Sequence, residues 1–134
     1  MKQMFAPLIV AVLLAAAPVF AVSNAHFVGT PTFTISGSTV TTSGKVAGLG
    51  NVLQIHVVLS GTAECINGGN KHPQAVNKGS FNAEGDFPVQ NGKALFSLIL
   101  EATFQPPCDP PMSVSWSELQ VTVTAGDGTF ISFP

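Results

Sequence analysis

The chain has 134 residues, of which only 9% are charged and 46% are hydrophobic, and it carries five lysines, no arginine and seven acidic residues. Without a basic cluster it has no surface that could neutralise a phosphate backbone or attract anionic lipids, which argues against nucleic acid and electrostatic membrane binding. The length is that of a single domain of ordinary size.

The N-terminal segment has the three-part layout of a secretory signal peptide. A lone Lys2 precedes an uncharged apolar run over residues 8–17, which ends at a proline and is followed by small residues at a cleavage position. A membrane-spanning helix needs about 20 apolar residues, so this shorter run favours a cleaved signal over an anchor. We expect removal of residues 1–21, or of residues 1–25 as the alternative, and one secreted domain over residues 22–134.

Alternation of apolar and polar residues predicts strands along the rest of the chain, and no stretch shows a sustained helical stripe. Residues 32–35 and 40–46 alternate on either side of Ser36-Gly37-Ser38, which predicts a hairpin. The first long strand is predicted over residues 52–64. Its two faces carry different side chains, with Leu53, Ile55, Val57 and Leu59 on one and Gln54, His56 and Ser60 on the other.

Residues 81–90 predict a broken strand, in which Gly85 and Pro88 mark a sheet edge or a bulge. Asn91-Gly92 is the favoured pair for a two-residue type I′ hairpin, since both of its central residues need positive φ. It leads into residues 93–104, whose strongly apolar face predicts a strand at the centre of its sheet. Residues 113–124 and 129–133 complete the pattern.

About seven short strands separated by turns predict an all-β fold, an antiparallel β-sandwich of immunoglobulin-like architecture, with an open barrel as the competing interpretation. We expect Trp116 to cap the core near the cysteines. The expected core is Phe33, Ile55, Val57, Leu59, Phe96, Leu98, Leu100, Val121 and Val123.

Cys65 and Cys108 are the two cysteines of the chain, and in an oxidising compartment an even pair predicts a disulfide. The bond would close a loop of about forty residues, worth roughly 3–4 kcal/mol in the chain-entropy model. Cys65 lies at the end of a strand pattern, and Cys108 lies in the proline-rich connection over residues 105–112. A metal site would need further ligands at suitable spacing, so we expect neither a metal nor another cofactor.

Histidines and carboxylates are the remaining candidates for chemistry. His26, His56 and His72 lack metal-ligand spacing, and we interpret them as surface residues, with a cross-strand neighbour such as Glu101 beside His56. No nucleophile elbow or calcium loop is present. The acids that glycoside hydrolysis could use stand in no distinctive motif: they are Glu64, Glu84, Asp86, Glu101, Asp109, Glu118 and Asp127.

The segment Cys65–Ser80 is the most distinctive part of the sequence, because two adjacent glycines between asparagines permit unusual backbone conformations. One interpretation is a surface loop that satisfies its own polar groups and is held at one end by the disulfide. The other is a binding loop, since long loops on rigid sandwiches often carry recognition. Its candidate binding residues are Asn67, Gly69, Asn70, Lys71, His72 and Gln74.

The chain resembles an uncharacterised family of small secreted proteins of bacteria and fungi over most of residues 22–134. The resemblance rests on the segment 43–51, the pattern Cys65-x-Asn67-x-Gly69-Asn70, a second cysteine in a proline-rich segment and a following tryptophan. Members carry proline where this chain has Gly68, and this chain is shorter before the tryptophan. The resemblance implies export and the β fold, and it implies no activity.

These observations predict a secreted, non-catalytic β-sandwich with a binding or structural role at the cell surface or in the extracellular medium. Its partner would be an extracellular ligand, with a cell-wall polymer and a protein as the candidates. Two alternatives stay open. One is a small hydrolase acting on carbohydrate or peptide, and the other is an inhibitor that inserts the Cys65–Ser80 loop into an enzyme. The apolar, uncharged strand 129–133 could also pair with a second copy.

Overall fold

The computed structural model describes residues 24–67 and 77–134, so the predicted signal segment lies outside the described residues. Within them the chain forms eight strands. They are β1 (His26–Phe27), β2 (Thr32–Ser36), β3 (Thr39–Ala47), β4 (Gln54–Ile66), β5 (Lys78–Pro88), β6 (Ala94–Glu101), β7 (Ser113–Ala125) and β8 (Phe130–Phe133).

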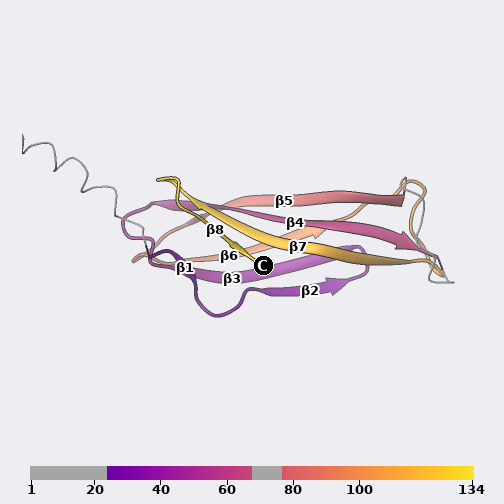
Figure 1. Cartoon of the computed structure of the whole chain (residues 1–134), viewed down its shortest axis with the longest axis horizontal. Helices are drawn as coiled ribbons and strands as arrows, with labels where there is room; N and C mark the ends of the chain where they lie inside the picture. The colour runs from indigo at the N-terminus through magenta and orange to yellow at the C-terminus, as the bar shows by residue number, and fades with distance from the viewer. Residues whose placement is uncertain (1–23, 68–76) are drawn as a thin grey trace, which may run out of the picture.

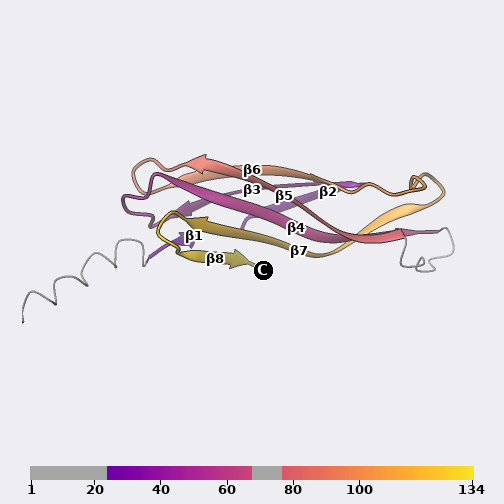
Figure 2. The same ribbon diagram turned by 90° about the horizontal axis from the view of Figure 1, so that it is seen from above.

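The strands form two antiparallel sheets that pack face to face along the long axis of the molecule (Figures 1 and 2). In the β3 sheet, β3 pairs with β6 on one side and with β1 and β2 on the other. The β4 sheet has the order β5-β4-β7-β8. The prediction of an antiparallel β-sandwich is therefore confirmed, with eight strands instead of about seven, and the immunoglobulin-like assignment stays a prediction.

The connection between β5 and β6 contains the predicted two-residue turn, although the two strands belong to different sheets and so form no hairpin. Asn91 and Gly92 have φ angles of 55° and 75°, which the type I′ geometry requires of both positions. Gln90 and Lys93 close the turn by exchanging two backbone hydrogen bonds, of 2.8 and 3.0 Å. This turn carries the chain from the β4 sheet into the β3 sheet.

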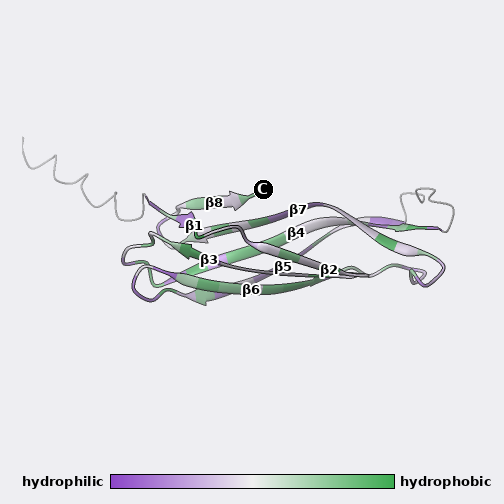
Figure 3. Cartoon of the chain, turned by 90° about the horizontal axis from the view of Figure 1, so that it is seen from below, coloured by the Kyte–Doolittle hydropathy of each residue, from purple (hydrophilic) through white to green (hydrophobic). Residues whose placement is uncertain are grey.

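The change of sheet places β5 and β6 at edges, and the central position predicted for residues 93–104 is wrong. Among the described strands β6 pairs with β3 alone. Its apolar character has two sources, an inner face buried in the core and an outer face on which Leu95 and Ile99 are 70% and 61% exposed. The long green stretch of β6 in Figure 3 reflects both faces.

The inner faces of the two sheets meet in one core, and most of the predicted core positions lie in it, while Phe33 and Leu98 are only half-buried against it. Leu53, which alternation placed on the same strand face as Ile55, is instead 85% exposed, because β4 begins only at Gln54. The buried hydrophobic cluster is Val40, Val46, Leu49, Ile55, Val57, Leu59, Ala94, Phe96, Leu100, Val121, Val123 and Ala125.

The connections gather at the two ends of the sandwich, as the strand registers show. The loop end carries the connections 48–53, 89–93 and 126–129. The disulfide end carries the β2–β3 turn and the long β6–β7 connection. There Trp116 packs against Phe81, with ring centroids 6.4 Å apart, and its Nε1 donates to the Gly37 carbonyl at 3.0 Å.

Candidate ligand-binding surface

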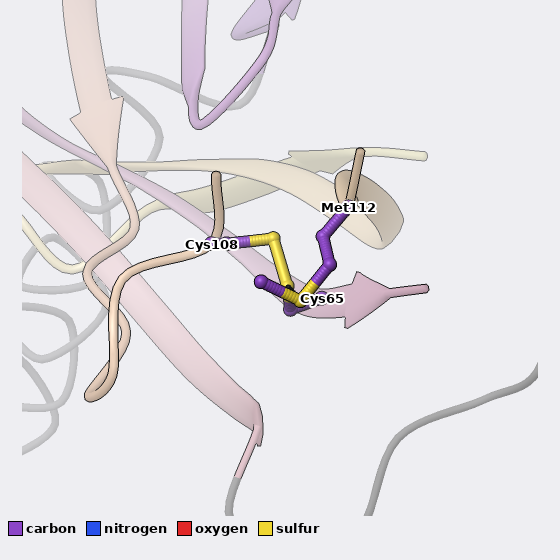
Figure 4. Close-up of a disulfide and its surroundings, with 3 residues drawn as sticks. All are labelled: Cys65, Cys108 and Met112. Atoms are coloured by element: carbon purple, nitrogen blue, oxygen red, sulfur yellow. Dashed lines mark hydrogen bonds between the residues drawn. A yellow bond between two sulfur atoms is a disulfide. The ribbon is translucent and has the colours of Figure 1, made fainter. Parts of the chain in front are cut away.

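The predicted disulfide is present at the disulfide end (Figure 4). Cys65 and Cys108 are bonded with a Cα–Cα distance of 5.8 Å, and they lie 43 residues apart in the chain. Met112 Sδ lies 3.7 Å from Cys65 Sγ, a packing contact between sulfurs, because an oxidised cysteine has no proton to donate. The bond fixes the proline-rich connection against the buried end of β4.

The predicted binding loop follows Cys65 directly, and the structure describes little of it. Asn67 is exposed just after the end of β4. The other candidates, Gly69, Asn70, Lys71, His72 and Gln74, lie outside the described residues, so the binding-loop interpretation stays a prediction.

His56 is the centre of the one ion-pair cluster among the described residues, on the outer face of the β4 sheet. Its Nδ1 lies 2.7 Å from Asp86 Oδ1, and its Nε2 lies 2.7 Å from Glu84 Oε1. The predicted neighbour Glu101 is not one of its partners, because Glu101 stands in the other sheet, opposite Thr39. Glu84 and Asp86 both reach His56 because residues two apart on β5 point to the same face of the sheet.

The geometry favours the protonated form of His56. A carboxylate only accepts hydrogen bonds, so both ring nitrogens of His56 must donate, and only the imidazolium has two donors. The hydrogen bonds to Asp86 and Glu84 accordingly raise the pKa of His56 above its ordinary value of 6.5. The side chains of Glu84 and Asp86 are more than half exposed on an open strand face, and both are occupied by His56.

The described residues contain neither a cluster of metal ligands nor a membrane-spanning helix. Among residues 24–67 and 77–134, no three His, Cys, Asp or Glu side chains are placed to hold a metal ion. In the His56 cluster the two carboxylates contact opposite ring nitrogens and so do not converge on one point. The same part of the chain contains no helix with the length and apolar content needed to cross a bilayer.

The outer face of the β3 sheet carries several serine and threonine hydroxyl groups. The register places Thr34 beside Thr41, and one row further along it places Thr32, Ser43 and Ser97 side by side. Thr32 Oγ1 and Ser43 Oγ are 3.0 Å apart, so neighbouring hydroxyls are close enough to share one ligand group. We call this surface the hydroxyl face; its residues are Thr32, Thr34, Ser36, Thr39, Thr41, Ser43 and Ser97.

The loop end is the hollowed part of the molecule. One hollow of about 610 Å³ is lined by connections 48–53 and 89–93, and a second of about 430 Å³ lies between residues 51–54 and Asp127. Leu53 lines both and stands almost fully exposed between them. A third hollow, of about 330 Å³, is lined in part by Lys45, Lys93 and Leu95 and adjoins the hydroxyl face.

Sequence reasoning did not identify the hydroxyl face or the lysines beside it as a surface. The alternation of threonines in residues 32–45 was a usable signal for one face of each strand. The alignment of three strands side by side was not, because it depends on pairings between distant segments. Comparison with known proteins finds no matching family, no matching curated protein and no matching solved structure.

Proposed function

We propose that the protein is exported and acts outside the cell as a non-catalytic β-sandwich that binds a hydroxyl-rich polymer of the cell surface. The observation that carries this proposal is the hydroxyl face, on which seven serine and threonine side chains from three strands stand in register. The signal-like N-terminus and the disulfide support export, because disulfides persist in oxidising compartments.

The hydroxyl face suits a polymer that is itself rich in hydroxyl groups. Each serine or threonine hydroxyl both donates and accepts hydrogen bonds, so it can pair with a sugar hydroxyl that acts as a donor or as an acceptor. Short side chains on paired strands also lose little conformational freedom on binding. Apolar Ile99, 61% exposed and beside Thr41, offers a surface for the C–H side of a sugar ring.

The proposal is tested by co-sedimentation of the mature protein with insoluble chitin, cellulose, β-1,3-glucan and peptidoglycan. The double variant T34V/T41V removes two neighbouring hydroxyls with almost no change of shape. Two lost hydrogen bonds should weaken binding about tenfold. The matched control T122V/T124V removes two threonine hydroxyls from β7, on the outer face of the other sheet, and should bind as the wild type does.

Equal losses in both double variants would contradict the assignment of the site to the hydroxyl face. Absence of binding to every polymer, together with capture of an extracellular protein by both variants, would contradict the polymer assignment itself.

A further inference from the structure

The third hollow at the loop end has an unusual lining for this chain. Two lysines, a glutamine and three apolar residues line its volume of about 330 Å³, and no acidic residue is among them. We call it the lysine hollow; its lining residues are Lys45, Pro88, Gln90, Lys93, Ala94 and Leu95.

The two cations of the lysine hollow are a large share of the positive charge in the structure. Three lysines lie within the described residues, and Lys45 and Lys93 are two of them. In that part of the chain neither forms an ion pair with a carboxylate. Two lysines that line one hollow and have no carboxylate partner among the described residues can each donate a charge-assisted hydrogen bond to an anion bound there.

No acidic residue of the described segments lines this hollow, although acids outnumber cations over the whole chain, and Asp127, at the same end of the molecule, lines a different hollow. Glu64, Glu84 and Asp86 stand on the outer face of the β4 sheet. On the β3 sheet the acid of β6 is Glu101, opposite the first residue of β3, whereas Lys45 lies near the last. The part of the hydroxyl face next to the lysine hollow, at Ser43 and Ser97, therefore carries no carboxylate, and Glu101 lies at the far end of that face, beside Thr39.

The lysine hollow is continuous with the hydroxyl face. Lys45 pairs with Leu95, and the next outward-facing pair along the same strands is Ser43 with Ser97. A ligand that places an anionic group against Lys45 therefore meets hydroxyls on one side and the 70% exposed Leu95 on the other. Each uronate unit of an acidic polysaccharide carries a carboxylate, hydroxyls and a C–H face, whereas an acidic peptide carries hydroxyls only at its serine, threonine and tyrosine residues.

We propose that the lysine hollow binds a carboxylate of a uronate-bearing polysaccharide whose chain continues over the hydroxyl face. This inference rests on the proposed polymer-binding function and names the chemical class of the polymer. Gln90 lines the hollow together with the two lysines and offers a carboxamide donor, and Leu95 and Pro88 add apolar surface.

The test is isothermal titration calorimetry of the mature protein with three probes at 20 mM and 500 mM NaCl. The probes are a polygalacturonate oligomer, the same oligomer fully methyl-esterified, and poly-glutamate of matched charge. We expect the polygalacturonate oligomer to bind best, and more weakly at high salt because the ammonium groups are near the surface. The K45Q/K93Q variant should bind it about fivefold more weakly at low salt. The control K78Q changes the third described lysine, on β5 of the other sheet, and should bind as the wild type does.

The other outcomes overturn the inference in distinguishable ways. Equal affinity for the free and esterified oligomers, unaffected by K45Q/K93Q, would remove the anion site and leave the polymer-binding function standing. Equal affinity for poly-glutamate would show that charge alone is recognised and would refute the polysaccharide assignment. Binding of none of the three probes, combined with no binding to any neutral polymer, would refute both proposals.

Discussion

Removal of the disulfide is the change whose effect on the free energy of unfolding follows most directly from the structure. The bond links residues separated by 43 positions, and the chain-entropy model assigns a cross-link of that span about 4 kcal/mol at 25 °C. For a domain of this length, that free energy corresponds to a fall in melting temperature of about 15 °C. The stabilisation comes from the unfolded chain, which the bond prevents from expanding.

The assay is guanidinium unfolding at 25 °C of the oxidised protein, the same protein reduced with a phosphine, and the C65A/C108A variant. The reduced protein keeps every side-chain heavy atom, so it isolates the cross-link from the packing of Cys65, which is 3% exposed. We expect both to lose about 4 kcal/mol, with C65A/C108A slightly less stable because it also leaves a small cavity. A loss below about 1 kcal/mol in the reduced protein would refute the reasoning, since it would show that the bond does not restrict the unfolded chain.

Two further predictions concern pH and backbone conformation. Because the pKa of His56 in the folded protein lies above 6.5, its contribution to stability is complete below pH 6.5 and is lost as the pH rises through the folded pKa. The denaturant concentration at half-unfolding of the wild type should therefore fall as the pH rises through that pKa. In the His56→Gln variant this fall should be absent. Gly48→Ala should cost about 2 kcal/mol or more in thermal unfolding, because φ is +74° and the added Cβ would overlap the Asn24 carbonyl oxygen.

Each of these predictions has an internal control. An NMR titration that follows the His56 ring protons, repeated in E84Q/D86N, should show a lower pKa in the variant; an unchanged value would exclude the carboxylates as its cause. Gly126→Ala adds a Cβ with open space around it and no positive φ, so its unfolding free energy should change by less than about 0.5 kcal/mol. Equal effects at Gly48 and Gly126 would contradict the conformational explanation.

Local features of the fold were predictable because their causes are local. The Asn91-Gly92 turn follows from the conformational preferences of two residues, and the strand faces follow from alternation. The pairing of Cys65 with Cys108 follows because a chain with two cysteines allows one intramolecular bond. The position of β6 at a sheet edge was not predictable, because an apolar strand is expected at the centre and only its pairing partners place it at an edge.

The candidate site could not be predicted from the sequence, because it also depends on which strands pair. Lys45 lies on β3 and Lys93 lies in the turn just before β6, and they line one hollow only because β3 and β6 pair in one register. The partners of His56 also depended on register, which selected Glu84 and Asp86 of β5 over Glu101. Leu53 was misassigned because alternation continues for one residue beyond the first ladder position of β4.

The most direct test of polymer binding through the β3 sheet is chemical-shift mapping of the ¹⁵N-labelled protein during titration with the polygalacturonate oligomer. We predict progressive shifts at the amides of Ser43, Lys45, Lys93 and Ser97, with the amides of Thr122 and Thr124 on the other sheet unmoved. Shifts confined to the Cys65–Ser80 segment, with the amides of the hydroxyl face unmoved, would contradict the account and favour the loop as the recognition site.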